Sequence, residues 1–175
     1  MSAAVHKQVY KNGRPVEIER KYLIYIPKLS LIEGCEGYES SEIEQLYLQQ
    51  GGRIRKRKFA DGCKYYFTLK QEINGISRYE TEREISEEEY LRLRKDILEG
   101  TRPIRKTRHC FLYKGQLFEL DIYEGAKQYA TLEIELESEE QSVELPGFLD
   151  IAADVTGDKR FRNFALARIE NDNFL

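Results

Sequence analysis

The chain has 175 residues, of which 34% are charged and 11% are aromatic, a composition that favours one soluble globular domain. Its 28 Lys and Arg residues are nearly balanced by 31 Asp and Glu residues, which gives a formal net charge of −3. A general nucleic-acid-binding protein would show a basic excess or a basic stripe, so no DNA partner is expected. No apolar segment approaches membrane-spanning length and no secretory signal is recognisable, so no membrane association is expected either.

The cysteines and histidines limit the redox and metal chemistry. Cys35, Cys63 and Cys110 are dispersed and form no CxxC motif, which indicates reduced thiols and a cytoplasmic location. His6 and His109 are the only histidines, and neither has a Cys or His neighbour at ligand spacing, which argues against zinc. A bound metal would need hard oxygen ligands, and this favours Mg²⁺ or Mn²⁺.

Residues 1–15 form a polar leader, and residues 16–175 are predicted to form a single domain. The leader is either a strain-specific extension or a strand-like addition. From Val16 onward apolar and polar residues alternate with period two, which is typical of β-strands. The expected strands are 16–25, 43–49, 53–59, 63–71, 76–85, 104–113, 116–124 and 128–137.

Glycine-containing pairs join several of these strands. Asp61-Gly62, Asn74-Gly75 and Lys114-Gly115 tolerate the positive φ that tight hairpin turns require. Eight mostly antiparallel strands with a few helices fit a sandwich or a closed barrel. Eight strands just close a barrel whose interior holds side chains or one small ligand.

Three segments depart from the strand pattern and predict helices. Residues 86–100 begin with Ser86 as N-cap and Glu89 three residues later, a capping box, and end at Gly100. Residues 160–169 indicate a shorter amphipathic helix, and residues 26–34 a further short turn of helix.

Charged residues occupy one face of seven of the strands, and residues of one sign are grouped by strand. In chain order they are Glu17, Glu19 and Lys21; Arg53, Arg55 and Arg57; Lys64 and Lys70; Arg78, Glu80, Glu82 and Glu84; Lys106 and Arg108; Glu119 and Asp121; and Glu133, Glu135 and Glu137. These faces could be the wetted outer sides of a sandwich. The alternative is that they line a water-filled barrel, whose apolar outer face is covered by helices and loops.

An inward-facing arrangement of this kind requires a ligand, because buried charges are costly unless they are paired or bind something. Arginine and lysine would hold phosphate oxygens, and glutamates would hold hard cations that bridge the phosphates. The charges therefore suit a polyphosphate–metal complex better than a sugar or a lipid. Arg57, Glu84 and Glu137 are expected at the rim or surface, and His109 on the opposite face from Lys106 and Arg108.

Several short motifs follow one another in a recognisable order. They are EIERK (Glu17, Glu19, Lys21), RIR (Arg53, Arg55), FTLK (Lys70), RYETEREI (Arg78, Glu80, Glu82), RKTR (Lys106, Arg108), LDIYEG (Asp121), TLEIEL (Glu133, Glu135) and VTGDKRFRNFALA (Arg160). Together they resemble the CYTH superfamily, the triphosphate tunnel metalloenzymes, from residue 16 to about residue 168. Two features depart from that pattern: the leader before the first motif, and Phe161 where tyrosine is common.

The resemblance implies a mainly β (α+β) fold, an eight-stranded antiparallel closed barrel forming a tunnel with a few flanking helices. Family members act on triphosphates with a divalent metal, and the form EIERKYL is most similar to short bacterial inorganic triphosphatases. The expected activity is therefore metal-dependent hydrolysis of the terminal phosphoanhydride of a small-molecule triphosphate. Tripolyphosphate is the first candidate, and nucleoside and thiamine triphosphates stay open. A homodimer is the assembly considered.

The resemblance also implies roles for individual residues. Glu17, Glu19, Glu133 and Glu135 would hold one or two Mg²⁺ or Mn²⁺ ions, with Asp121 as a further ligand or as a partner of the ligands. The phosphate-binding set is Lys21, Arg53, Arg55, Lys70, Arg78, Lys106, Arg108 and Arg160. The catalytic set is Lys70, Glu80 and Glu82, in which the two glutamates orient the cations or the metal shell and do not act as a base.

Three other interpretations stay open at this point. An adenylate cyclase would use the same metal and phosphate residues, with the ribose hydroxyl of ATP as nucleophile. A noncatalytic polyphosphate-binding module would use the tunnel without cutting, although simple anion binding has no use for four glutamates. The third is a β-sandwich with wetted faces.

Overall fold

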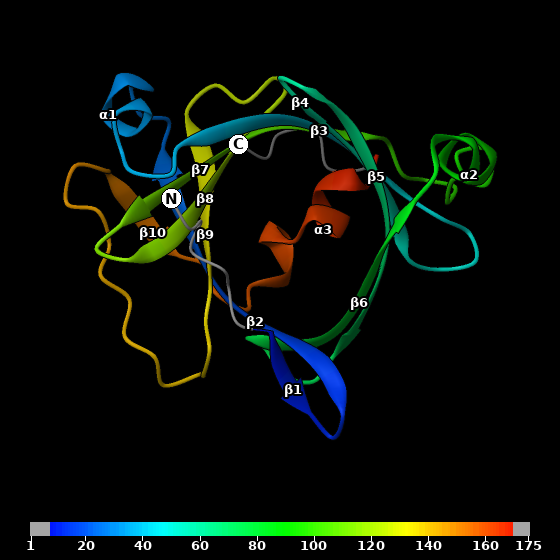
Figure 1. Ribbon diagram of the computed structural model, residues 1–175, viewed down its shortest axis with the longest axis horizontal. Coiled ribbons are helices and arrows are strands. Elements are labelled where there is room, and N and C mark those ends of the chain that lie inside the picture. Colours follow the sequence, from blue (N-terminus) through cyan, green and yellow to red (C-terminus); the bar gives the residue numbers. More distant parts are fainter. Residues whose placement is uncertain (1–7, 170–175) are drawn as a thin grey trace.

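The computed structural model describes residues 8–169 of the chain, and its main feature is a continuous antiparallel sheet that closes on itself. In spatial order the strands are β2, β6, β5, β4, β3, β7, β8 and β9, and β9 pairs again with β2. Their bounds are β2 Arg14–Tyr25, β3 Glu39–Tyr47, β4 Arg53–Phe59, β5 Gly62–Glu72, β6 Ser77–Ile85, β7 Ile104–Tyr113, β8 Gln116–Tyr123 and β9 Tyr129–Glu135. The predicted eight-stranded closed barrel is confirmed (Figure 1).

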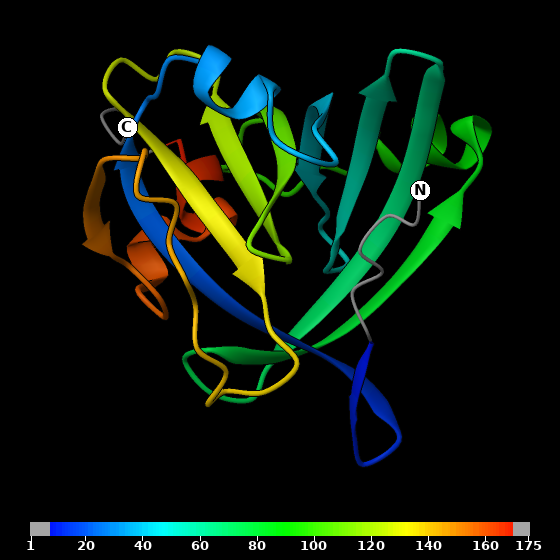
Figure 2. The same cartoon turned by 60° about the vertical axis from the view of Figure 1, so that its left-hand side comes forward.

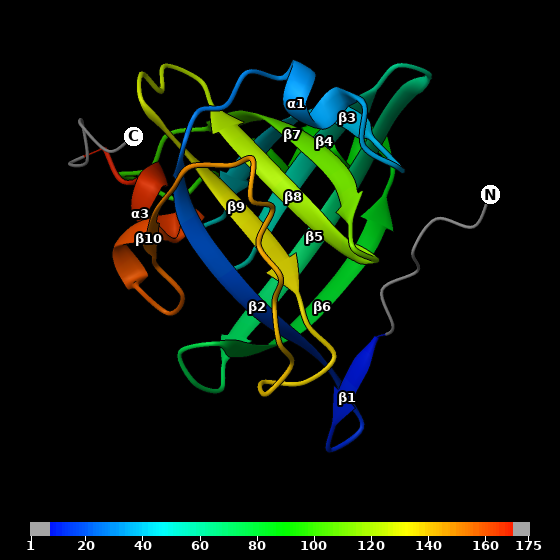
Figure 3. The ribbon, with the colours of Figure 1, turned by 90° about the vertical axis from the view of Figure 1, so that its left-hand side faces the viewer.

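Two further short strands pair with β2. Strand β1 (Val9–Lys11) forms a hairpin with the start of β2, and β10 (Ile151–Asp154) pairs with its end. The hairpin turn is made by Asn12 and Gly13, both with positive φ. The part of the predicted leader that is described is thus a strand-like addition to the barrel (Figure 3), and residues 1–7 lie outside the described residues.

Each of the eight predicted strands is present, with shifted ends. The largest shift is in β3, which was expected at 43–49 and lies at Glu39–Tyr47. The register with β7 explains this shift, because Glu39 already pairs with Cys110. Lys114 and Gly115 have φ of 49° and 75°, which fits the two-residue turn predicted between β7 and β8.

The predicted helices are present but shorter. Helix α2 spans Glu87–Leu93, and the Ser86 side chain accepts a hydrogen bond from the Glu89 amide as the capping box requires. It ends before Gly100 because the chain turns to pair with β3, where the Leu98 amide donates to the Tyr47 carbonyl. Residues 159–169 divide into a 3-10 turn (Lys159–Phe161) and α3 (Asn163–Ala167), and residues 26–34 contain α1 (Ser30–Glu33).

The largest hydrophobic cluster lies outside the barrel wall. Ile18, Leu120 and Ile134 belong to it and point away from the lumen, since their neighbours in sequence point inward. The cluster is covered by Ile32 of α1 and by Leu136 and Leu149 of the long connection between β9 and β10, which runs along the outer side of the barrel (Figure 2). The apolar faces are therefore buried without filling the lumen, and the sandwich interpretation is wrong.

Helix α2 and helix α3 cover different parts of the barrel. Tyr90 of α2 packs on Leu46 and Ile54 outside β3 and β4. Helix α3 lies across one end of the barrel (Figures 1 and 3), where Leu166 packs against Ile104 and Tyr123. One end of the lumen is thus closed by the C-terminal segment.

Within residues 8–169, no helix is long and apolar enough to cross a membrane. The cytoplasmic location and the homodimer stay predictions.

Candidate active site inside the barrel

Inward-facing side chains enclose a cavity of about 630 Å³. Among the described residues, its lining combines eight glutamates with eight lysines and arginines. They are Glu17, Glu19, Glu72, Glu80, Glu82, Glu119, Glu133 and Glu135, with Lys21, Arg53, Arg55, Arg57, Lys70, Arg78, Arg108 and Arg162. Because the two sets balance in formal charge, the cavity has no net positive charge with which to attract a bare polyanion.

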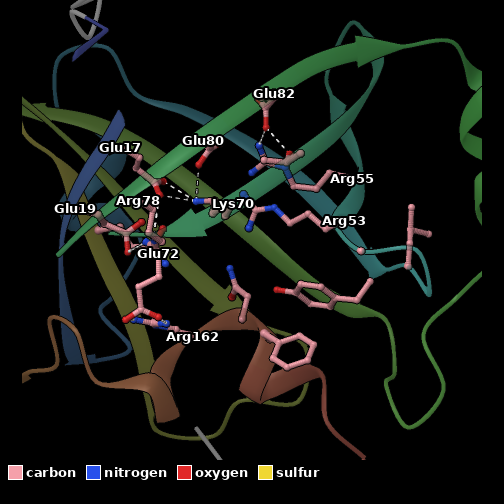
Figure 4. Close-up of a pocket in the computed structure, with 18 of the residues that line it drawn as sticks. Glu17, Glu19, Arg53, Arg55, Lys70, Glu72, Arg78, Glu80, Glu82 and Arg162 are labelled. Atoms are coloured by element: carbon pink, nitrogen blue, oxygen red, sulfur yellow. Dashed lines mark hydrogen bonds and ion pairs between the residues drawn. The ribbon is translucent and has the colours of Figure 1, made fainter. Parts of the chain in front are cut away.

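Strand register places opposite charges next to each other on the β2–β6–β5 side. Lys70 lies opposite Glu80, and Glu17 opposite Arg78. The Lys70 Nζ is 2.6 Å from Glu80 Oε2 and 2.7 Å from Glu17 Oε1, and Arg78 Nε is 3.1 Å from Glu17 Oε2 (Figure 4). These side chains therefore form one connected ionic network, and Lys70, predicted from the FTLK motif, lies at its centre.

Glu80 and Glu82 are held ionised in this network. Burial opposes ionisation, but Lys70 and Arg53 together lower the pKa of Glu80 below its ordinary value. For Glu82 burial is likewise outweighed by Arg55, and the Thr68 hydroxyl donates to its carboxylate at 2.7 Å. A carboxylate with a lowered pKa is a weak proton acceptor. The arrangement agrees with an orienting role for both glutamates.

The adjoining β2–β9–β8 part of the wall is different, because like charges face each other there. Glu19 of β2 lies opposite Glu135 of β9, and Glu119 of β8 lies opposite Glu133 of β9. We call Glu17 and these four glutamates the acidic face. Directly opposed like charges destabilise a sheet. Their arrangement here implies that something else compensates them.

Glu135 has a strongly raised pKa. Partial burial inside the barrel, and next Glu17 and Glu119, raise its pKa to about 8. The side chain still reaches the water of the cavity. Glu133 behaves in the opposite way, since its pKa lies well below the ordinary value because Lys21 and Arg108 outweigh the effect of burial. The two neighbouring glutamates of β9 thus have pKa values shifted in opposite directions.

The acidic face supplies carboxylate oxygens, which are the donors that Mg²⁺ and Mn²⁺ prefer. A divalent cation would also relieve the repulsion from Glu17 and Glu119, which adds to burial in raising the pKa of Glu135. In the described part of the chain, no three Asp, Glu, His or Cys side chains stand close enough to form a ready metal site. Lys21, Lys70 and Arg78 instead pair with members of the acidic face. The donors fit a hard cation in chemistry, and binding one requires these ion pairs to rearrange.

Lys106 and Asp121, predicted as a phosphate ligand and a metal ligand, lie behind the cavity and do not line it. The Asp121 side chain is 0% exposed and pairs with Lys106. It also accepts hydrogen bonds from Arg108, with Nε to Oδ1 at 2.7 Å and Nη2 to Oδ2 at 2.6 Å. Arg108 alone of the three reaches the cavity, where it contacts Glu133 and Glu119. Asp121 therefore fixes the orientation of the Arg108 guanidinium, and Lys106 pairs with the same carboxylate.

Arg160 lies apart from the other predicted site residues. Its side chain is 79% exposed and pairs with Asp158, two residues away on the same turn. Arg162 lines the cavity instead, and its guanidinium donates to both carboxylate oxygens of Glu72 on β5 at 2.9 and 3.2 Å (Figure 4). Of the basic residues in the C-terminal motif, Arg162 is therefore the one that the fold brings to the site.

Arg53 differs from the other predicted cations. It is 9% exposed, lines the cavity and has no carboxylate within ion-pair distance among the described residues. Its Nε has no hydrogen-bond partner. The guanidinium hydrogen-bonds Tyr47 and helps lower the pKa of Glu80, but a buried guanidinium that forms no ion pair favours binding of an anion. Arg53 is thus the strongest single indication of an anion site in the cavity.

Several lining residues were not assigned from the sequence. Glu119 shares the inward face with Asp121, and the alternation of β8 was the signal that could have found it. Glu72 and Thr68 alternate with outward-facing residues of β5 and so share the inward face with Lys70. Tyr47 of β3 and Phe164 of α3, whose ring centres are 5.0 Å apart, line the closed end; no pattern joins them in sequence.

Comparisons with known proteins agree with this architecture. The family model of the CYTH domain matches residues 16–156. The inorganic triphosphatase NE1496 is 32% identical, with a TM-score of 0.55 over 86% of this chain and 93% of that chain. A structure described as the hypothetical protein NE1496 gives 30% identity and a TM-score of 0.55 over 86% of this chain and 96% of that chain.

A more distant structure supports the fold alone. The PH1819 protein from Pyrococcus horikoshii OT3 is 21% identical, with a TM-score of 0.52 over 71% of this chain and 80% of that chain. No curated protein sequence matches the chain. With its closed barrel, its paired Glu-x-Glu motifs facing one lumen and a family match over most of its length, this chain belongs to the CYTH domain family.

Proposed function

We propose that this protein hydrolyses the terminal phosphoanhydride bond of a linear triphosphate, with inorganic tripolyphosphate as the preferred substrate and Mg²⁺ or Mn²⁺ as cofactor. The family match and the similarity to the inorganic triphosphatase NE1496 support the general activity. The observation that carries the proposal is one cavity in which carboxylates of β2, β8 and β9 face one another and in which Arg53, among the described residues, forms no ion pair. Such a cavity suits a ligand that brings both phosphate and divalent metal.

The balance of charges supports the metal requirement. Eight glutamates already match the eight cationic side chains of the lining, so a triphosphate alone would leave the cavity with a large excess of negative charge. Glu17, Glu19, Glu133 and Glu135 would hold the divalent cation. When bound, it supplies a Lewis acid that withdraws charge from phosphate oxygens and lowers the pKa of a water molecule.

The chain's own residues position and stabilise the triphosphate. Arg53, Arg55 and Lys70 project from adjacent strands β4 and β5 towards the lumen, and they hold phosphate oxygens in line for displacement. Arg108 is fixed by two hydrogen bonds to Asp121, so it is already oriented when the substrate arrives. Phosphoryl transfer passes through a loose transition state, and these fixed positive charges stabilise its equatorial oxygens.

The test is release of phosphate from tripolyphosphate by the purified full chain, with Mg²⁺, with Mn²⁺ and with a chelator. We expect turnover with either metal and none with the chelator. Glu135→Gln should lower turnover by about 10²–10³-fold, whereas the matched control Glu137→Gln, which lies beyond β9 and outside the cavity lining, should leave it unchanged. Chelator-resistant turnover, or an active Glu135→Gln variant, would overturn the metal assignment.

The same assay with ATP separates the cyclase alternative. ADP and phosphate are the products expected of a triphosphatase, whereas cyclic AMP and pyrophosphate would identify a cyclase. Binding of polyphosphate without any phosphate release would identify a noncatalytic module.

A further inference from the structure

Gln45 of β3 is a buried polar residue that the proposed function does not use. It is 0% exposed and does not line the cavity. Its Nε2 donates a hydrogen bond to the Tyr47 hydroxyl at 2.8 Å, and its buried Oε1 has no hydrogen-bond partner among the described residues. A buried amide oxygen without a partner costs stability, and an apolar side chain of similar length would avoid that cost. The fold alone therefore gives no reason for a glutamine at this position.

Tyr47 connects Gln45 to the cavity. The two residues are two positions apart on β3, so their side chains share the inward face of the strand. Tyr47 lines the cavity and lies opposite Arg53 of β4 in the strand register. The Arg53 guanidinium donates a hydrogen bond to the Tyr47 hydroxyl. One hydroxyl thus joins the buried amide of Gln45 to the guanidinium that points into the cavity (Figure 4).

The Tyr47 side chain is held at both ends. Gln45 binds its hydroxyl, and its ring packs edge-on against the ring of Phe164, with 5.0 Å between the ring centres. Phe164 belongs to helix α3, which lies across this end of the barrel (Figure 3). The hydrogen-bond acceptor for Arg53 therefore has a fixed position before any ligand binds.

The partners that orient Arg53 carry no charge. Burial raises the pKa of the Tyr47 hydroxyl above its ordinary value, so the phenol stays protonated, and the amide of Gln45 does not ionise. Six of the eight cations of the cavity lining have a carboxylate within ion-pair distance, whereas among the described residues Arg53 and Arg57 have none. Arg57, expected at the rim or surface, also lines the cavity, and its Nε donates to the Ser41 hydroxyl at 2.8 Å. Neutral partners orient a guanidinium without cancelling its charge.

We propose that Gln45 is a positioning residue, which acts through the Tyr47 hydroxyl to hold the Arg53 guanidinium in place for a phosphate oxygen. The inference rests on the proposed function and adds to it a residue that does not touch the substrate. A guanidinium that is already oriented loses less conformational entropy when an anion binds. The unpartnered Oε1 of Gln45 is accepted because the same side chain places a hydrogen-bond donor behind Tyr47.

The direct test is the order of the Arg53 Nε–H group, measured by NMR relaxation on the full chain without substrate. The signal is assigned by its absence in Arg53→Met. We expect an order parameter of about 0.85 in the wild type, as in rigid backbone, and below about 0.6 in Gln45→Met. Tyr47→Phe removes the acceptor and leaves Gln45 in place, so it should give the same low value, and it serves as the test if Gln45→Met does not fold. Unchanged order of Arg53 in either folded variant would overturn the inference.

A double-mutant cycle shows whether Gln45 acts through Arg53. One neutral hydrogen bond corresponds to about 2- to 10-fold in affinity, so Gln45→Met should lower kcat/KM for tripolyphosphate with Mg²⁺ by a factor in this range, mainly through KM. In the Arg53→Met background the same change should have no further effect. An equal further loss in that background would mean that Gln45 acts independently of Arg53, and the positioning role would be wrong.

Gln116→Met is the matched control. Gln116 of β8 lies outside the cavity lining and has two hydrogen bonds of its own, from its Nε2 to the Ser142 carbonyl and from the Glu144 amide to its Oε1, both at 3.0 Å. Its replacement should lower Tm without changing kcat/KM or the order of Arg53. If Gln116→Met loses as much activity as Gln45→Met, the loss comes from general destabilisation and the inference fails.

The NMR measurement keeps this inference separate from the proposed function, because it requires no turnover. If the wild type releases no phosphate from tripolyphosphate but Gln45→Met loosens Arg53, the positioning role stands and the proposed function fails. If phosphate is released and the order of Arg53 is the same in both proteins, the positioning role fails and the triphosphatase stands.

Discussion

Two clusters of charged residues on neighbouring strands of the barrel differ in how their charges are paired. Around Asp121, two cations and one carboxylate are buried together, and each charged group has an opposite charge in contact. Around Glu135, by contrast, carboxylates face each other, since Glu19 of β2 lies opposite Glu135 of β9. Partial burial and the nearby Glu17 raise the pKa of Glu135 to about 8. The first cluster is complete as the protein folds. In the second, five carboxylates share the four cations Lys21, Lys70, Arg78 and Arg108.

This difference separates structure from function among residues that look equivalent in sequence. Asp121 and Glu135 are both acidic, inward-facing and flanked by apolar residues. A residue whose charge is satisfied by the fold should affect stability first when it is changed. A residue whose charge the fold leaves in excess should affect activity first. The predictions below test this distinction, from the largest effect to the smallest.

Asp121→Asn should be the most destabilising of these changes. It leaves Lys106 and Arg108 buried with less opposing charge, and breaking a buried ion pair from one side costs about 3–5 kcal/mol. Denaturant unfolding would measure the loss in the free energy of unfolding. Glu124→Gln is the control, because Glu124 pairs with Arg105 at the surface and should cost less than about 1 kcal/mol. Similar losses in both variants would remove the contrast between the clusters.

Glu133→Gln and Glu135→Gln should each lower tripolyphosphate turnover by about 10²–10³-fold, the range for losing one preorganised electrostatic group in an active site. The two should differ in stability. Glu133 pairs with Lys21 and Arg108, so its amide should destabilise the fold, whereas Glu135→Gln removes repulsion and should not. Phosphate release and thermal melting, measured on the same preparations, check both parts. A destabilised Glu135→Gln would contradict the assignment of excess charge.

Arg53→Met should lower kcat/KM by about 10²-fold, because hydrogen bonds from a guanidinium to an ionic partner contribute up to about 3 kcal/mol. The same change should cost little stability, since Arg53 forms no ion pair among the described residues and its Nε has no hydrogen-bond partner. A large loss of activity with little loss of stability is the signature of a residue kept for its ligand. Arg83→Met, on the outer face and paired with Glu89, is the control for both measurements. If Arg53→Met lowers both quantities, Arg53 belongs with the structural cluster.

Arg162→Ala should lower kcat/KM by about tenfold, because Arg162 lines the cavity from the C-terminal segment and is held there by Glu72. Arg160→Ala should stay within about twofold, since its partner Asp158 lies on the same exposed turn. Steady-state kinetics of the two variants side by side decide between the residue predicted from the sequence and the one that the fold brings inward. A larger loss of kcat/KM in Arg160→Ala than in Arg162→Ala would assign the phosphate-binding role to Arg160.

Alternation is a local property, so it predicted the strands and their two faces, and the resemblance of the motifs to a known family decided between a sandwich and a closed barrel. A period of two fixes which residues share a face, and the turn pair Lys114-Gly115 fixes which strands are neighbours. Glu17, Glu19, Glu133 and the three inward-facing residues of β6 could therefore be placed correctly in one lumen. How deep each side chain lies is not local, which is why Lys106 was predicted to bind phosphate although it does not line the cavity, and why Asp121 was left as either a metal ligand or a partner of the ligands.

The C-terminal segment is a second region in which the sequence pattern does not reveal which side chain faces the cavity. Residues 155–169 have no alternation that fixes a face, and a 3-10 turn divides them. Arg160 and Arg162 are two positions apart, and only the docking of Asn163, which accepts a hydrogen bond from Tyr123 at 2.6 Å, decides which of them turns inward. Tyr123 lies 40 residues away in sequence, so no pattern within the motif could have shown it.

The pH dependence of stability should give the smallest effect and the most direct test of the acidic face. In the unfolded chain Glu135 ionises near pH 4.5, and in the folded barrel near pH 8. Between these values the folded state retains the proton, so raising the pH removes stability, and the loss is complete above about pH 8. Because the carboxylate contacts cavity water, the penalty is screened to about 1 kcal/mol, or about 2–4 °C in Tm for a chain of this size. Without metal, the Tm of the wild type should fall between pH 6 and pH 8.5 by more than the Tm of Glu135→Gln does. Added Mg²⁺ should remove this extra fall in Tm, because it neutralises the Glu135 carboxylate. A constant offset between the two proteins across this range, with or without Mg²⁺, would mean that the acidic face is already compensated by the fold.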